Sequence, residues 1–158
     1  MKKAIERRFI RLMRANQPMA KDEVVSLWPR EYYPRLTRLD GASTMIFDIV
    51  DRESCRISGE IALRFGEGKS LFYLGHVGYH IDPPFRGKNE ALRACRLCIP
   101  IFAAMGMRSF VITTDVTNMP SIRTCEKLGC VLESTVQVPG WCRAVFELDK
   151  QKRRYVYK

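Results

Sequence analysis

The stretch His76-Val-Gly-Tyr-His-Ile-Asp-Pro-Pro-Phe-Arg-Gly-Lys-Asn-Glu-Ala91 decides the fold, because a strand, a basic loop and a helix follow one another within it. Its first part belongs to a predicted strand, Leu71–Ile81, and the prolines after Asp82 end that strand because proline cannot donate to a ladder. Apolar residues then recur at three- and four-residue steps, which predicts an amphipathic helix containing Pro100. The β-branched segment Ser109–Thr114 predicts the next strand. This order indicates a right-handed crossover between two parallel strands.

The segments before this crossover predict an antiparallel sheet. Phe9–Arg14 is interpreted as a first strand, with a helix left open because its apolar residues do not alternate cleanly. We expect a helix from Pro18 to Trp28 and an irregular connection over residues 29–42. Thr44–Val50 and Ile57–Phe65 then predict a hairpin of two β-strands.

The segments after the crossover predict one more helix and a final hairpin. The helix is expected to be capped by Thr117 or Asn118 and closed by Gly129, and the hairpin strands are Val131–Val138 and Ala144–Leu148. The predicted class is α+β, with a mixed, mostly antiparallel sheet, a central βαβ crossover and flanking helices. A chain of 158 residues fits a single domain over residues 1–158.

The charge and the apolar pattern limit the classes of partner. The net charge of +10 lies at the two ends, because residues 39–148 hold as many acidic as basic side chains. This argues against nucleic acid as a partner of the whole domain, and residues 149–158 are interpreted as a solvated basic tail that could still meet RNA or a ribosome. No apolar stretch suits a membrane span or a signal peptide, so we expect a cytoplasmic protein without a membrane partner.

Six cysteines are expected to be reduced and mostly buried. Cys95 and Cys98 have the spacing of half a zinc site, but no second pair of this kind exists. We therefore expect them to pack on the apolar face of their helix, with no bound metal.

The loop Arg86-Gly-Lys-Asn89 is expected to bind an anion. It opens a helix, where backbone N–H groups lack partners and the helix dipole is positive. Arg86 and Lys88 add charge, and Gly87 allows a phosphate to approach the backbone. A pyrophosphate suits this loop, although the spacing of the kinase-type phosphate loop is absent.

The same residues resemble a known family. Gly78-Tyr-His-Ile-Asp-Pro-Pro-Phe-Arg-Gly-Lys-Asn-Glu-Ala91 is similar to the acetyl-CoA motif of the GNAT superfamily of N-acetyltransferases, Arg/Gln-x-x-Gly-x-Gly/Ala after a strand. Asn118-Met-Pro-Ser-Ile-Arg-Thr-Cys-Glu-Lys-Leu-Gly129 resembles the family segment Asn-x-x-Ser-x-x-x-Tyr-x-Lys-x-Gly. Asn89 stands where the family has glycine, and Cys125 where it often has a tyrosine that protonates the leaving thiolate.

The resemblance implies a splayed sheet and acetyl-CoA as cosubstrate. It also implies direct attack by a primary amine, on a small molecule or a protein N-terminus, without an acyl-enzyme. The expected cofactor-binding residues are the backbone of Tyr79, His80 and Ile81 for the pantetheine arm, Arg86, Gly87, Lys88, Asn89, Glu90 and Ala91 for the pyrophosphate, and Asn118 and Ser121 beside the arm.

Several residues are candidates for the two catalytic roles, a base and an acid. The attacking amine must lose a proton, and the candidate bases are His80, which we favour, Glu60 and His76. Cys125 is a candidate acid, but packing on its helix is the favoured interpretation because a thiol is a weak donor.

Two further hypotheses stay open from the sequence. One is a CoA-binding module that has lost catalysis, suggested by the departures at Asn89 and Cys125, and the other is an RNA- or ribosome-associated protein. The acceptor is expected between residues 25–42 and 134–143, and the positive charge argues against polyamines. A homodimer is left open.

Overall fold

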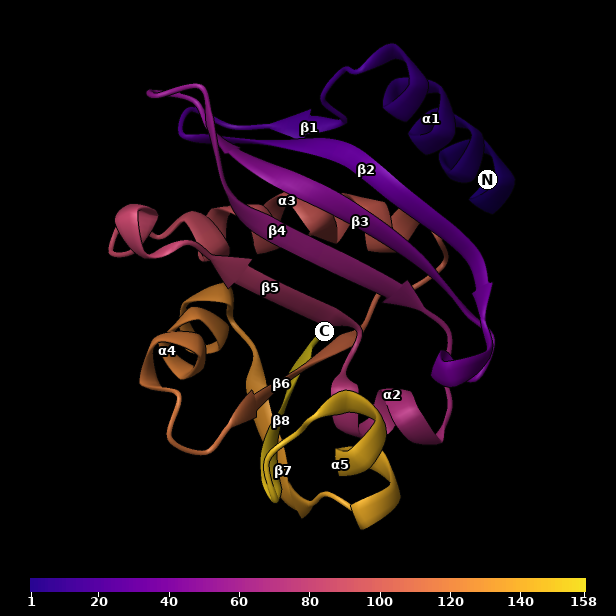
Figure 1. The fold of residues 1–158 in the computed structure, drawn as a ribbon, viewed down its shortest axis with the longest axis vertical. Helices are drawn as coiled ribbons and strands as arrows, with labels where there is room; N and C mark the ends of the chain where they lie inside the picture. The colour runs from indigo at the N-terminus through magenta and orange to yellow at the C-terminus, as the bar shows by residue number, and fades with distance from the viewer.

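The chain forms two antiparallel sheets in a computed structural model that describes residues 1–158 (Figure 1). The first sheet has the order β1-β2-β3-β4-β5, with bounds Ala20–Lys21, Val25–Leu36, Ala42–Asp51, Arg56–Phe65 and Val77–Ile81. The second has the order β6-β8-β7, with bounds Phe110–Asp115 for β6, Gln151–Tyr157 for β8 and Val131–Gln137 for β7. The predicted α+β class is confirmed.

Five α-helices flank the sheets: α1 (Lys2–Ala15), α2 (Lys69–Leu74), α3 (Glu90–Ala104), α4 (Met119–Leu128) and α5 (Gly140–Phe146). Two 3-10 turns, η1 (Thr37–Leu39) and η2 (Pro83–Phe85), lie in connections. In Figure 1, α3 covers the rear of the first sheet and the front of β2–β4 is not covered by a helix. None of the helices is both long and apolar enough to cross a membrane.

The main core lies between the first sheet and the helices α1 and α3. Alternate residues of β3 and β4 point into it, as the two-residue period of a strand requires, and Met45, Phe47 and Ile61 are fully buried. Phe9 of α1 meets Phe47 edge-on, with ring centroids 5.1 Å apart. We call this buried side of β2–β5 the inner face and the uncovered side the outer face.

The amino-terminal predictions need correction. Phe9–Arg14 is helical, which was the open alternative to a strand, because its apolar residues continue an amphipathic pattern that begins at Ile5. The helix expected from Pro18 to Trp28 is absent. The Asp22 carboxylate accepts backbone N–H bonds from the residues two and three positions later, which turns the chain from β1 into β2.

The irregular connection expected over residues 29–42 is also wrong, because β2 continues to Leu36 by pairing with β3, and η1 follows it. The remaining elements agree with the sequence except near the end and before β5. The hairpin β3–β4, the helices α3 and α4, and the strands β6 and β7 occur as predicted, whereas the first residues of the Leu71–Ile81 strand form α2. The segment Ala144–Leu148, predicted as a strand, mostly belongs to α5.

Residues 149–158 are not a solvated tail. They contain β8, which is the middle strand of the second sheet. Lys152 pairs with Asp115 at 2.6 Å, and Arg154 pairs with Glu133 at 3.0 Å, so two of the basic side chains are neutralised at buried positions.

Candidate active site

A wedge opens between β5 and β6 and organises the candidate site. The two strands are joined at their first residues, where the His76 N–H donates to the Val111 carbonyl at 2.7 Å. No ladder pairs them beyond this point, and they diverge toward α4 (Figure 1). The predicted parallel crossover is therefore present, with its strands splayed apart.

The open edge of β5 leaves backbone groups facing the wedge. Antiparallel pairing bonds alternate residues of β5 to β4, and the Asp82 N–H donates to the Ser58 carbonyl at 2.7 Å. Even-numbered residues such as His80 therefore direct their backbone at β4, while Tyr79 and Ile81 direct theirs at the wedge. Of the three backbones predicted to hold a pantetheine arm, these two are oriented for it.

The loop before α3 has the geometry of an anion site. Asn89 adopts a left-handed conformation, with φ 59° and ψ 28°, which explains how asparagine replaces the glycine of the family motif. Gly87 also has a positive φ of 89°, and a β-carbon there would meet no atom within 4 Å. The backbone N–H groups from Gly87 to Leu92 donate to no acceptor within the protein, so they are free to meet a ligand.

Three cationic side chains surround this loop. Arg86 and Lys88 are exposed, and Arg86 Nε donates to the Ile81 carbonyl at 2.8 Å. The third, Lys127 of α4, was not predicted as a site residue, and its Nζ donates to Asn89 Oδ1 at 3.3 Å. The lysine of the second family motif was the signal that could have identified it.

Glu90 occupies the first position of α3, but its carboxyl group turns away from the loop. It is buried, and its Oε1 accepts a hydrogen bond from Ser58 Oγ at 2.8 Å. Burial, and then the neighbouring Asp51 carboxyl, raise the pKa of Glu90. Only the backbone of this residue is placed to meet an anion, and its side chain anchors the loop to β4.

Tyr79 and Ser121 link β5 to α4 across the wedge. The Tyr79 hydroxyl and Ser121 Oγ lie 2.7 Å apart, and burial raises the pKa of the phenol. Asn118 caps α4 by accepting a bond from the Ser121 N–H at 3.2 Å. The sequence assigned Tyr79 a backbone role, so its hydroxyl is a feature that sequence reasoning missed.

Cys125 lies in the hydrophobic core. Its side chain has no exposed surface, and the Cys130 thiol is its neighbour. The interaction with the Cys130 thiol, and then burial, raise the pKa of Cys125 well above its usual value. This environment suits packing, in line with the favoured interpretation.

The outer face of the sheet brings His80 and Glu60 together as cross-strand partners. His80 is exposed, and its Nε2 lies 3.3 Å from Asp82 Oδ1. Glu60 is bonded to Arg30, which also pairs with Asp48 at 2.7 Å. Glu60 is therefore held in a charge network, whereas His80 remains accessible to solvent.

His76 has a structural environment. It is buried, its Nε2 bonds to the Gly66 carbonyl at 3.0 Å, and its Nδ1 accepts the Val111 N–H at 3.0 Å. Burial lowers its pKa, so the ring is held neutral where it joins β5 to β6. His76 thus lies at the closed end of the wedge and not on the outer face with His80 and Glu60, the other candidate bases.

Cys95 and Cys98 lie on the buried side of α3, as expected from its apolar face. Burial raises the pKa of both thiols, to about 12 for Cys95. Both residues pack as small hydrophobic groups.

Several solved acetyltransferases have a similar fold. Microcin C7 self immunity acetyltransferase MccE, in complex with acetyl-CoA and AMP, is 21% identical with a TM-score of 0.55, and the match covers 72% of this chain and 60% of that chain. The ribosomal-protein-S5-alanine acetyltransferase from Vibrio fischeri is 22% identical with a TM-score of 0.55, covering 72% and 61%. RimL, a ribosomal L7/L12 alpha-N-protein acetyltransferase in complex with coenzyme A, is 18% identical with a TM-score of 0.55, covering 72% and 61%.

This chain thus spans about three fifths of the length of these proteins. No curated protein sequence matches it. The family model for the acetyltransferase (GNAT) domain matches residues 7–131, which include the wedge, the anion loop and α4. The chain belongs to the GNAT acetyltransferase family.

Proposed function

We propose that this protein transfers the acetyl group of acetyl-CoA to a primary amine, on a small molecule or a protein N-terminus. The observation that carries the proposal is the loop from Arg86 to Asn89, whose free backbone N–H groups and left-handed Asn89 form an anion site beside the open wedge. The acetyl-CoA and CoA complexes of similar structures support the same cosubstrate.

The wedge suggests how the cosubstrate is held. The pyrophosphate binds the N–H groups of the loop, with Arg86, Lys88 and Lys127 supplying positive charge. The pantetheine arm then pairs with the open edge of β5 at Tyr79 and Ile81. A backbone N–H directed at the wedge, once preorganised, stabilises the oxyanion of the thioester carbonyl by a few kcal/mol.

The amine attacks the thioester directly in this proposal. His80 is the favoured base, because it is exposed on the outer face and Asp82 can orient its ring. Glu60 is a weaker candidate, since it is bonded to Arg30. The hydroxyl pair of Tyr79 and Ser121, which lies at the wedge, is better placed than Cys125 to protonate the leaving thiolate.

The test is the release of free CoA from acetyl-CoA with a panel of amines, against controls without an amine. Thermal denaturation with and without CoA is measured in parallel, because a ligand that binds only the folded state raises the melting temperature. Amine-dependent release supports the proposal. Stabilisation by CoA without release would favour a CoA-binding module instead.

A further inference from the structure

A cavity lies on the outer face, away from the anion loop. It measures about 670 Å³, within the usual range for small-ligand pockets. It is bounded by β2 and η1 on one side and by the end of α5 on the other, and its lining is mainly apolar, including Leu36, Ile46, Leu74 and Phe146. Its lining residues on β2 and η1 fall within one of the two segments expected to meet the acceptor, and those at the end of α5 lie just beyond the other.

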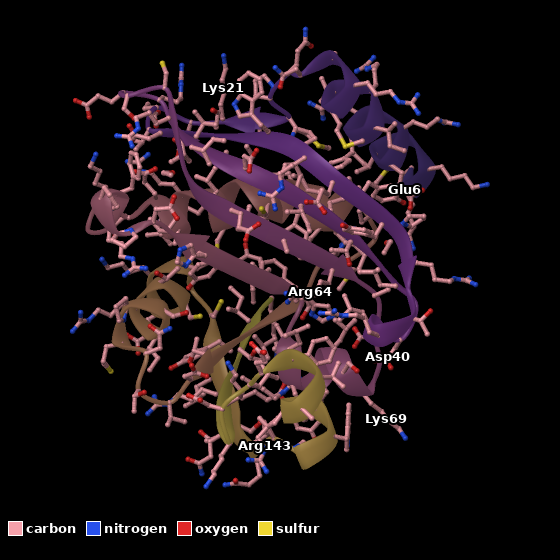
Figure 2. All side chains as sticks on the ribbon, in the orientation of Figure 1. Glu6, Lys21, Asp40, Arg64, Lys69 and Arg143 are labelled. Carbon is pink, nitrogen blue, oxygen red and sulfur yellow. The ribbon has the colours of Figure 1, made fainter.

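Arg64 of β4 projects into this cavity, and its side chain is held in place. Its Nη1 donates to the Gly75 carbonyl at 3.1 Å. Its guanidinium group lies over Gly78 of β5, since a β-carbon built at that glycine would lie 2.7 Å from Nη2. In Figure 2 Arg64 is seen in the middle of the molecule, between the first sheet and α5.

Arg64 has no carboxylate partner, unlike Arg30 on the same face of the sheet. Arg30 is paired with Glu31, Asp48 and Glu60. Arg64 forms no ion pair, and neither its Nε nor its Nη2 donates to a protein acceptor. Arg38 also lines the cavity without an ion pair, and burial together with Arg38 lowers the pKa of Arg64 to about 10.

The charge balance of the cavity therefore favours an anion. Glu147 is its one acidic side chain, and it is exposed at the rim without pairing to either arginine. A partly buried guanidinium with free donors is stabilised by a planar carboxylate, which it can bind through two parallel hydrogen bonds. Inorganic cations and polyamines are disfavoured here.

The cavity is placed to present an amine to the wedge. Gly78, which the Arg64 side chain covers, directly precedes Tyr79, whose backbone faces the wedge. Neighbouring residues of a strand are about 3.3 Å apart. A carboxylate bound by Arg64 thus lies beside the strand that is proposed to hold the pantetheine arm.

We infer that the acceptor is an amine that carries a carboxylate and an apolar portion, with Arg64 binding the carboxylate and the apolar lining holding the rest. This inference rests on the proposed acetyl transfer. A free amino carboxylate and a peptide N-terminus bearing an acidic side chain share this chemistry, and the experiment below separates these two sources.

The experiment compares acceptors in matched pairs, by CoA release at saturating acetyl-CoA. Leucine and phenylalanine are each compared with their amides, and a dipeptide with an acidic second residue, its own carboxyl terminus amidated, with the corresponding neutral dipeptide amide. The carboxylate member of at least one type of pair is expected to have a kcat/KM about 10- to 100-fold higher, the scale of a lost charge-assisted pair. The type of pair that shows the preference identifies the source of the carboxylate.

Two variants assign the preference to Arg64. Arg64→Gln should remove it, mainly by raising KM, and Arg64→Lys, which keeps the charge without the planar fork, should retain part of it. Arg30→Gln is the matched control from the same face, and its ratio within each pair should be unchanged. Equal use of both members by the wild type, or an unchanged ratio in a folded Arg64 variant, would overturn the inference.

A binding measurement separates this inference from the proposed function. N-acetyl-leucine and its amide are added to the CoA-saturated protein, and the melting temperature is recorded. Stabilisation by the carboxylate alone, lost in Arg64→Gln, supports the site even if no amine is acetylated. Absence of CoA release with every amine would instead overturn the acetyl-transfer proposal.

Discussion

Replacing Cys125 by alanine distinguishes a catalytic thiol from a packed one. The substitution removes one sulfur atom from a side chain with no exposed surface. Deleting one buried heavy atom costs about 0.5–1.5 kcal/mol. We expect the melting temperature to fall by about 1–6 °C, at about 2–4 °C per kcal/mol for a chain of this size.

Turnover should respond very differently in the two cases. A packed Cys125 leaves kcat within a few-fold of the wild type, whereas loss of a general acid lowers kcat by about 100-fold or more. The assay is CoA release at saturating acetyl-CoA and acceptor, from pH 6 to 9, after the melting temperature has shown that the variant is folded. Tyr79→Phe serves as the comparison, because it removes the hydroxyl that meets Ser121 and should lower kcat more than Cys125→Ala does.

The result that would refute this reasoning is a large kcat defect in Cys125→Ala with an unchanged melting temperature. The thiol would then be reaching the substrate, which its burial in the core excludes. Cys125→Tyr is a second test of whether this side chain is packed in the core. A phenol ring at this closely packed position should destabilise the fold by about 1–3 kcal/mol.

Three other predictions concern the loop and the closed end of the wedge. Arg86→Glu should weaken CoA binding by about 100-fold, because it replaces a charge-assisted contact by repulsion. Thermal shifts with CoA measure this affinity, and Arg96→Glu, on the exposed side of α3, is the control. Wild-type CoA affinity in a folded Arg86→Glu variant would contradict the assignment of the loop to the pyrophosphate. Asn89→Gly should be as stable as the wild type, whereas Asn89→Ala should lower the free energy of unfolding, measured in urea, by about 1 kcal/mol, because the backbone at this position is left-handed. Equal stability of the two variants would argue against this loop geometry. The pKa of His76 is lowered in the folded protein, so the unfolded chain binds more protons below about pH 6.5. The free energy of unfolding should therefore fall as the pH is lowered from about 6.5. His76→Gln should reduce this pH dependence in urea titrations, and an unchanged pH dependence would point to other groups.

The central part of the fold was predictable because its signals are local. The strand ending before Asp82, the basic loop and the apolar period of α3 are contiguous in sequence, and Asn118 and Gly129 mark the two ends of α4. The chain ends were mispredicted because the decisive interactions there are long-range. Lys152 and Arg154 were predicted to lie in a solvated tail, because their ion-pair partners, Asp115 and Glu133, are distant in the sequence.

The candidate site shows the same division. The anion loop follows from a motif, and the left-handed backbone of Asn89 explains the departure from the family's glycine. The outer-face cavity could not be predicted, because the role inferred for Arg64 depends on the absence of a carboxylate partner, which only the folded structure reveals. Three carboxylates gather around Arg30, and none pairs with Arg64.

The place of β8 has a consequence for the order in which the protein assembles during its synthesis. β6 and β7 do not touch through a ladder of their own, since β8 lies between them and pairs with both. The ribosome makes β1–β5 and α3 first, so one wall of the wedge can form while residues 151–157 are still untranslated. The opposite wall must wait for β8. Until then, nascent chains expose the unpaired edges of β6 and β7, and during that interval they are open to mispairing with other strands.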